Sequence, residues 1–237
     1  MQAWQTVVML TLMAGMAMPL GGWLSSVGRL GPAWLDNELR HGIVAFGGGA
    51  LLSAVALVLV PEGSAELSAG VAVAWLLAGG LAFMGLDVWL QRSDTQASQL
   101  AAMLADFVPE ALALGAAFAL GGEGGVLLAV LMALQNLPEG FNAIQELKRG
   151  TDYSTRRLLL IFVAMAWLGP VAGLGGLFWL SHYPQAVSAI MLFASGGILY
   201  SVFQDLAPQA RLEQHWAPPL GAVLGFALGL AGHLLMP

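Results

Sequence analysis

Apolar stretches of about twenty residues follow one another along nearly the whole chain. A hydrocarbon core about 30 Å thick takes roughly 20 residues of helix per crossing, and eight such stretches account for almost all of the 237 residues. With 58% hydrophobic and only 9% charged residues, the chain cannot be a soluble domain with a mostly polar surface. We therefore predict an all-α bundle of eight transmembrane helices, forming one domain over residues 1–237 within the lipid bilayer. The predicted helices span residues 4–25, 40–60, 69–90, 100–120, 124–145, 157–181, 185–207 and 217–235.

Basic residues occupy only some of the connections between these helices. All eight Lys and Arg residues fall in or beside odd-numbered connections, whereas the second connection, residues 61–66, carries only acids. By the positive-inside rule, the odd connections face the cytoplasm and both termini lie outside a cell (inner) membrane. No Lys or Arg precedes the first apolar stretch, so we interpret it as a retained helix rather than a signal peptide. The basic residues are Arg29, Arg40, Arg92, Lys148, Arg149, Arg156, Arg157 and Arg211.

Two matching hexapeptides place acids and proline in the middle of apolar helices. The first is Asp-Phe-Val-Pro-Glu-Ala at 106–111, and the second is Gln-Asn-Leu-Pro-Glu-Gly at 135–140. In each, the Glu follows another polar residue by four positions, which puts both side chains on one helical face. A carboxylate near the bilayer centre costs about 3 kcal/mol or more, so we expect these acids to have a function. Each Pro also lacks an N–H, which leaves the carbonyls of Ala105 and Leu134 free to kink the helix or to face an ion.

The polar side chains of the two hexapeptides form the candidate ion site. A Gly-rich turn at residues 121–125 joins the two helices, so we expect them to pack as antiparallel neighbours with both motifs at the same depth. The chain has no cysteine, which excludes thiolate ligands. An alternative is that the acids are protonated and only form hydrogen bonds within the bundle. The candidate metal ligands are Asp106, Glu110, Gln135, Asn136 and Glu139.

The second and seventh predicted helices resemble each other. Both carry Gly-rich segments, at 47–49 and 196–197, and both end in a proline motif, Val-Pro-Glu-Gly at 60–63 and Ala-Pro-Gln-Ala at 207–210. In the predicted topology the two helices run in opposite directions. This pattern suggests an inverted repeat of helices 1–3 and 6–8 around helices 4–5, as in many alternating-access transporters. The alternative is that Gly-rich apolar helices look alike without being repeats.

Over its whole length the chain resembles a divergent member of the ZIP (Zrt/Irt-like protein) family of divalent metal transporters. The family signature is His-Asn-x-Pro-Glu-Gly in the fourth helix and a similar polar motif in the fifth, which residues 135–140 match closely. The resemblance implies transport of a divalent metal cation into the cytoplasm: zinc, or a harder ion such as manganese or iron. This metal is the cargo, and no cofactor is expected. The resemblance also suggests a transport pathway that includes Glu62, Gln204 and Asp205.

The chain departs from the family pattern at three places. Asp106 replaces the fourth-helix His, Phe107 replaces the following Asn, and Gly169 stands where an acid often precedes the proline of helix six. The remaining ligands are all oxygen, which suits harder cations such as Mn²⁺ and predicts a site for a single metal. Protons should compete with the metal for these carboxylates, so we expect uptake to weaken as the outside pH falls.

Other classes of function remain open at this point. The lost His and helix-six acid leave room for a ZIP-like metal-binding or sensor protein that does not transport, and for a passive cation channel through the same acids. An enzyme is not expected, because the sequence lacks Gly-x-Ser-x-Gly, His-Glu-x-x-His and Gly-x-Gly-Asp motifs. No nucleic-acid partner is expected, and a homodimer is left open. Asp87 is interpreted as an interfacial residue at the end of the third helix.

Overall fold

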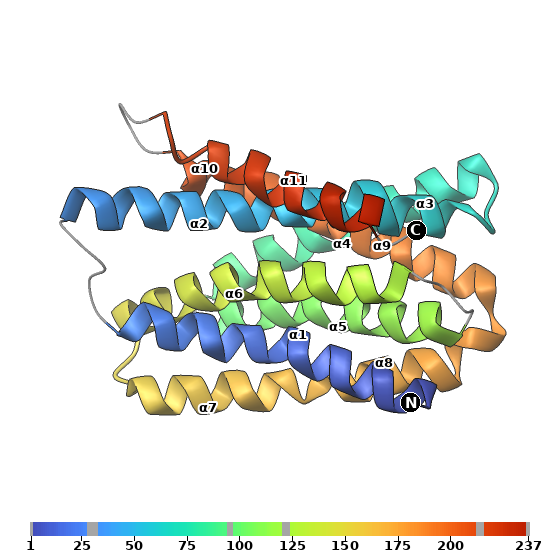
Figure 1. The fold of residues 1–237 in the computed structure, drawn as a ribbon, viewed down its shortest axis with the longest axis horizontal. Coiled ribbons are helices and arrows are strands. Elements are labelled where there is room, and N and C mark those ends of the chain that lie inside the picture. Colours follow the sequence, from blue (N-terminus) through green and yellow to red (C-terminus); the bar gives the residue numbers. More distant parts are fainter. Residues whose placement is uncertain (1, 28–32, 94–96, 120–123, 212–215, 236–237) are drawn as a thin grey trace.

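The computed structural model describes residues 2–27, 33–93, 97–119, 124–211 and 216–235. This part of the chain is all-helical and contains no strand. Figure 1 shows the long helices lying side by side along one common direction, with the start of α1 and the end of α11 toward the same end of the bundle. The predicted all-α bundle is therefore confirmed for the described residues. Arg29 and residues 121–123 of the predicted turn lie outside them.

The helices follow the predicted apolar stretches closely. In chain order the elements are α1 (Ala3–Ser26), α2 (Ala33–Ala54), the π-helical turn η1 (Val55–Leu59), α3 (Val60–Ser64), α4 (Ala69–Ser93), α5 (Ala97–Ala119), α6 (Gly124–Gly150), α7 (Thr155–Ala166), α8 (Leu168–Phe178), the 3₁₀ turn η2 (Leu180–His182), α9 (Pro184–Ser201), the π-helical turn η3 (Val202–Leu206), α10 (Ala207–Ala210) and α11 (Leu220–Leu235). Most predicted boundaries differ from these by a few residues.

Six helical segments of the described chain are long and apolar enough to cross a membrane. They are Ala3–Ser26, Glu38–Ser64, Ala69–Leu90, Gly125–Lys148, Thr155–Phe178 and Pro184–Ala210. The α11 helix is apolar but shorter, and α5 is not among the six. The apolar helices support an integral membrane protein. The two further crossings stay a prediction.

Two proline residues do not end their helices, contrary to the predicted boundaries at 60 and 207. Pro61 and Pro208 lie at the starts of α3 and α10, which continue the helices before them. A π-helical turn precedes each proline: the N–H of Val60 bonds the carbonyl of Val55, five residues back. In the same way, the N–H of Ala207 donates to the carbonyl of Val202. The wider turn lets the helix pass a residue that has no N–H to donate.

The helices form two closely packed groups that meet along α2, α6, α5 and α9. In one group α1 packs along α6, and α5 packs along α8; in the other, α2 packs along α11 and α4 along α9. Contacts of α2 with α6 and of α5 with α9 join the two groups. Small residues allow the closest approaches, because a Cβ on Gly140 would collide with the carbonyl of Met18, and a Cβ on Gly49 with that of Ala222. The fold therefore brings both hexapeptides to the boundary between the groups.

Candidate functional site

The two hexapeptides lie on α5 and α6, which contact each other as predicted. Pro109 lies inside α5 and Pro138 inside α6, and both helices continue through their proline. A proline cannot donate to the carbonyl four residues earlier, so each helix has a backbone oxygen without its usual donor next to the polar side chains. The local sequence thus places side-chain and backbone oxygens at the same level of each helix.

A buried hydrogen bond joins the two hexapeptides. The Nε2 atom of Gln135 donates to Oε2 of Glu110 over 2.6 Å. The side chain of Glu110 is 0% exposed and that of Gln135 is 4% exposed. A hydrogen bond to a carboxylate in such a buried place is strong and orients both groups. The bond therefore ties α5 to α6 and fixes which oxygen of each side chain remains available.

Three buried oxygens of these motifs have no hydrogen-bond partner among the described residues. They are Oδ1 of Asp106, Oε1 of Glu110 and Oε1 of Gln135. An unsatisfied buried polar atom costs about 1–3 kcal/mol, so several in one place call for an explanation. Carboxylate and amide oxygens are the ligands that hard divalent cations prefer. The donor set fits a bound cation.

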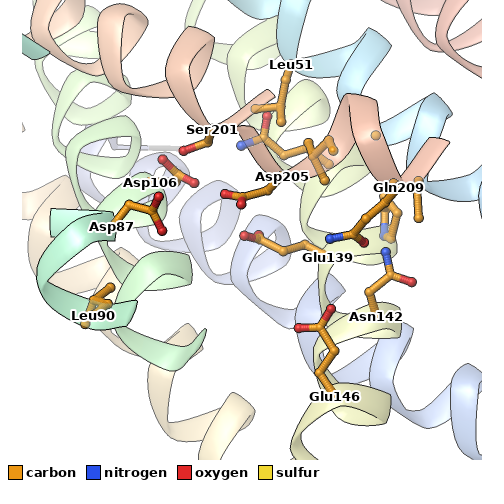
Figure 2. Close-up of a pocket in the computed structure, with 15 residues that line it drawn as sticks. Leu51, Asp87, Leu90, Asp106, Glu139, Asn142, Glu146, Ser201, Asp205 and Gln209 are labelled. Atoms are coloured by element: carbon orange, nitrogen blue, oxygen red, sulfur yellow. The ribbon is translucent and has the colours of Figure 1, made fainter. Parts of the chain in front are cut away.

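A cavity of about 340 Å³ opens beside these oxygens. Figure 2 shows four carboxylates, those of Asp87, Asp106, Glu139 and Asp205, turned toward the same space. They come from four elements, α4, α5, α6 and η3. The residues that line the cavity are Val44, Gly47, Leu51, Asp87, Leu90, Asp106, Gln135, Pro138, Glu139, Asn142, Glu146, Ser201, Asp205, Leu206 and Gln209.

The structure brings together most, but not all, of the residues predicted for the site and its pathway. The cavity is lined by Asp106, Gln135, Glu139 and Asp205. Glu110 does not line it, but its side chain accepts a hydrogen bond from Gln135, which does. Within the described chain, the other three predicted residues neither line the cavity nor form a side-chain hydrogen bond with a residue that lines it.

Asn136, Gln204 and Glu62 lie away from the cavity. The Nδ2 atom of Asn136 donates to the carbonyl of Ala14 over 2.9 Å and so joins α6 to α1. Gln204 is exposed on η3, and Glu62 lies half-buried on α3. Their predicted roles as ligand and pathway residues stay predictions.

Several polar residues of the cavity were not among the predicted site residues. Asp87, interpreted from the sequence as interfacial, lines the cavity and accepts a 2.9 Å hydrogen bond from the hydroxyl of Tyr200. Asn142 and Glu146 follow Glu139 by three and seven positions, so helical spacing alone puts them on its face. Gln209 likewise follows Asp205 by four positions. That spacing is the signal that could have found them, whereas nothing in the sequence pairs Asp87 with this face.

The carboxylates do not form a compact cluster in this structure. Within the described ranges, no three Asp, Glu or His side chains stand close enough together to hold a metal ion by themselves. A cation at this site therefore needs amide or backbone oxygens beside the carboxylates. The nearest such oxygens by sequence position are the amide oxygen of Gln135 and the carbonyls of Ala105 and Leu134, four residues before the two prolines.

Models of known protein families and curated protein sequences give no match to this chain. An assignment of function therefore rests on the sequence pattern and on the site itself.

Proposed function

We propose that the chain carries divalent metal cations across a membrane into the cytoplasm, as its resemblance to the ZIP family suggests. One observation carries the proposal: three buried oxygens without partners lie on α5 and α6 beside a cavity lined by carboxylates. Acids inside a membrane bundle are costly and typically mark an ion pathway. A passing divalent cation would supply the positive charge that balances these carboxylates.

The proposed cation binds to Asp106 and Glu139, with Oε1 of Gln135 as an amide ligand. Glu110 contributes its remaining oxygen and orients Gln135 through their hydrogen bond. Asn136 remains a candidate through its amide oxygen, because its amide nitrogen is used by Ala14. All of these ligands are oxygen, so the proposed site takes one divalent cation and accepts harder ions than an imidazole site does.

The proposed pathway follows the cavity to one end of the bundle. Polar residues continue along α6 from Glu139 to Glu146, and Asp205 and Gln209 face them from η3 and α10. The nearby helix ends carry Lys148 and Arg211, which the positive-inside rule assigns to the cytoplasm. The cavity would then be the cytoplasmic exit, and Glu62, on α3 at the other end of its helix, would lie toward the entrance.

The proposed topology has eight crossings of the cell (inner) membrane, with both termini on the side away from the cytoplasm. It adds α5 and α11 to the six long apolar segments, because α5 packs along α8 and α11 packs along α2. The paired π-helical turns before Pro61 and Pro208 support an inverted repeat, since they recur at the same distance from the proline in the second and seventh crossings.

Metal uptake into liposomes containing the purified protein tests this function. We expect saturable uptake from a panel of divalent metals, including Zn²⁺ and Mn²⁺. Glu139→Gln should reduce uptake at least about tenfold, because it removes a charge from a site of low dielectric constant. Glu66→Gln is the matched control, since Glu66 is exposed outside the cavity. Full uptake by a well-folded Glu139→Gln protein would place the site elsewhere.

A passive cation channel is the second candidate, favoured by the lack of a compact three-acid cluster among the described residues. A weak site would let cations pass without saturation. Flux that rises in proportion to metal concentration would support the channel. Metal binding without any flux would support a binding or sensor protein instead.

A further inference from the structure

A second, larger cavity lies on the other side of α2. It has a volume of about 740 Å³ and lies between α2, the η3–α10 segment and the start of α11. Its walls are apolar apart from Arg211, the one charged residue among those that line it. The lining residues are Val44, Ala45, Gly48, Leu52, Val202, Phe203, Leu206, Ala207, Ala210, Arg211, Trp216, Pro219 and Ala222. We call this cavity the α2–α11 groove.

The chemistry of the groove has two parts. Most of it offers only aliphatic and aromatic surface, whereas Arg211 and Trp216 lie in the connection between α10 and α11. Trp216 is 89% exposed, and exposed Trp residues are typical of the membrane–water interface. Arg211 is also exposed; its backbone N–H donates to the carbonyl of Pro208, but no described residue forms a hydrogen bond or ion pair with its guanidinium. An elongated apolar ligand with an anionic end matches this arrangement.

We propose that the α2–α11 groove binds an anionic phospholipid, with an acyl chain against α2 and α11 and the phosphate on Arg211. Basic residues between transmembrane helices on the cytoplasmic side recognise anionic headgroups, and the positive-inside rule assigns Arg211 to that side. The volume falls in the range of small-ligand sites. A free phosphate ion would use Arg211 but none of the apolar wall, so a lipid accounts for both parts.

The lipid site shares a wall with the acidic cavity. Val44 and Leu206 line both cavities, and Leu206 directly follows Asp205 on η3. At Gly48 the two elements of this wall pack against each other, because a Cβ there would be in ordinary contact with the side chains of Leu206 and Val202, at 3.7–4.0 Å. A bound acyl chain therefore lies against the turn that carries Asp205.

Lipid binding to the purified full chain tests the proposal. Native mass spectrometry of the protein in detergent can compare phosphatidylglycerol with phosphatidylcholine of the same acyl chains. We expect the wild type to prefer phosphatidylglycerol about fivefold, the preference that one basic residue near a headgroup provides. Arg211→Gln should remove this preference. Arg92→Gln is the matched control, because it removes another exposed positive charge, at the end of α4 and outside the groove.

A second variant tests the apolar part. Ala207 is exposed and lines the groove, so Ala207→Trp should fill it and weaken the binding of both lipids several-fold. Arg211→Gln changes only a surface side chain and carries the test even if Ala207→Trp does not fold. The proposal is overturned if Arg211→Gln keeps the preference, if Arg92→Gln loses it equally, or if inorganic phosphate competes as well as the lipid. A dimer that Ala207→Trp dissociates would instead make the groove an interface between copies.

Discussion

At the scale of single residues, the pair formed by Glu110 and Gln135 is the feature on which the site depends most. Both side chains are buried, and each satisfies one atom of the other while leaving an oxygen free. The cost of a buried polar group falls when it has a partner and returns in full when the partner is removed. The pair therefore couples the stability of the bundle to the geometry of the candidate ligands.

Replacing one member of this pair should destabilise the fold. Gln135→Met leaves Oε2 of Glu110 without its donor, so we expect the free energy of unfolding to fall by about 1–3 kcal/mol. The double variant with Glu110→Met and Gln135→Met should lose less stability than the sum of the two single variants, because it removes both partners and so leaves neither polar group buried without its hydrogen bond. Unfolding in mixed detergent micelles measures all three. Gln204→Met, on an exposed position, should change stability by less than about 0.5 kcal/mol; strict additivity in the double variant would contradict the coupling.

Asp106 should determine which metals are preferred. Its Oδ1 is one of the unpartnered oxygens, and it stands where the ZIP signature has a His. Asp106→His replaces a charged oxygen ligand by a neutral, softer nitrogen, so the preference for Zn²⁺ over Mn²⁺ should rise about tenfold. Competition uptake in liposomes with both metals measures the ranking, with Asp152→His, outside the cavity, as the control. An unchanged ranking would remove Asp106 from the ligand set.

At the scale of helices, close contact between α1 and α6 holds the second hexapeptide in place. Gly140 ends that hexapeptide and faces the carbonyl of Met18 on α1, and Gly21 faces the carbonyl of Leu137 in the same interface. Asn136 adds its hydrogen bond to Ala14. The residues between Gln135 and Gly140 thus serve the packing of α6 on one face and the cavity on the other.

A methyl group at Gly140 should force these two helices apart. Gly140→Ala places a Cβ against the backbone of Met18, which cannot give way as a side chain could, so we expect a loss of about 1–3 kcal/mol of unfolding free energy. Gly85→Ala is the matched control, because a Cβ there meets nothing within 4 Å, and it should be neutral or stabilising by up to about 1 kcal/mol. Unfolding in micelles distinguishes them. Equal stability of the two variants would mean that α1 and α6 do not pack this closely.

At the scale of the whole molecule, the charge pattern and the fold agree on one point. Figure 1 shows α1 beginning and α11 ending at the same end of the bundle, as an even number of crossings requires. The end of α6 and the start of α7, which carry Lys148, Arg156 and Arg157, lie at the opposite end. The fold thus separates the chain ends from these basic residues, while the side that faces the cytoplasm is still a prediction.

Reporter fusions should show this orientation. We expect a reporter joined after Pro237 to lie outside the cytoplasm and one inserted after Asp152, between α6 and α7, to lie inside it, because basic connections are retained on the cytoplasmic side. Alkaline phosphatase and green fluorescent protein report opposite sides and control for each other. A C-terminal reporter found in the cytoplasm would exclude the proposed topology.

The sequence by itself determined the helical class and the position of the two acid-bearing hexapeptides. Length and apolarity of each stretch are local properties, and the four-residue spacing of Asp106 and Glu110 follows from helix geometry alone. The boundaries at Pro61 and Pro208 were wrong, because a π-helical turn satisfies the backbone before each proline. A rule that lets proline end a helix does not include that compensation.

Only the tertiary structure decided which side chains meet. Asp87 and Asp205 reach the cavity because α4 packs along α9, which η3 continues. These segments are far apart in the sequence, so no local pattern encodes their contact. Asn136 and Gln135 are neighbours in the sequence, yet a helix turns about 100° per residue, so one bonds α1 and the other faces Glu110. Helical spacing shows which residues share a face, whereas the packing of the other helices decides what that face meets.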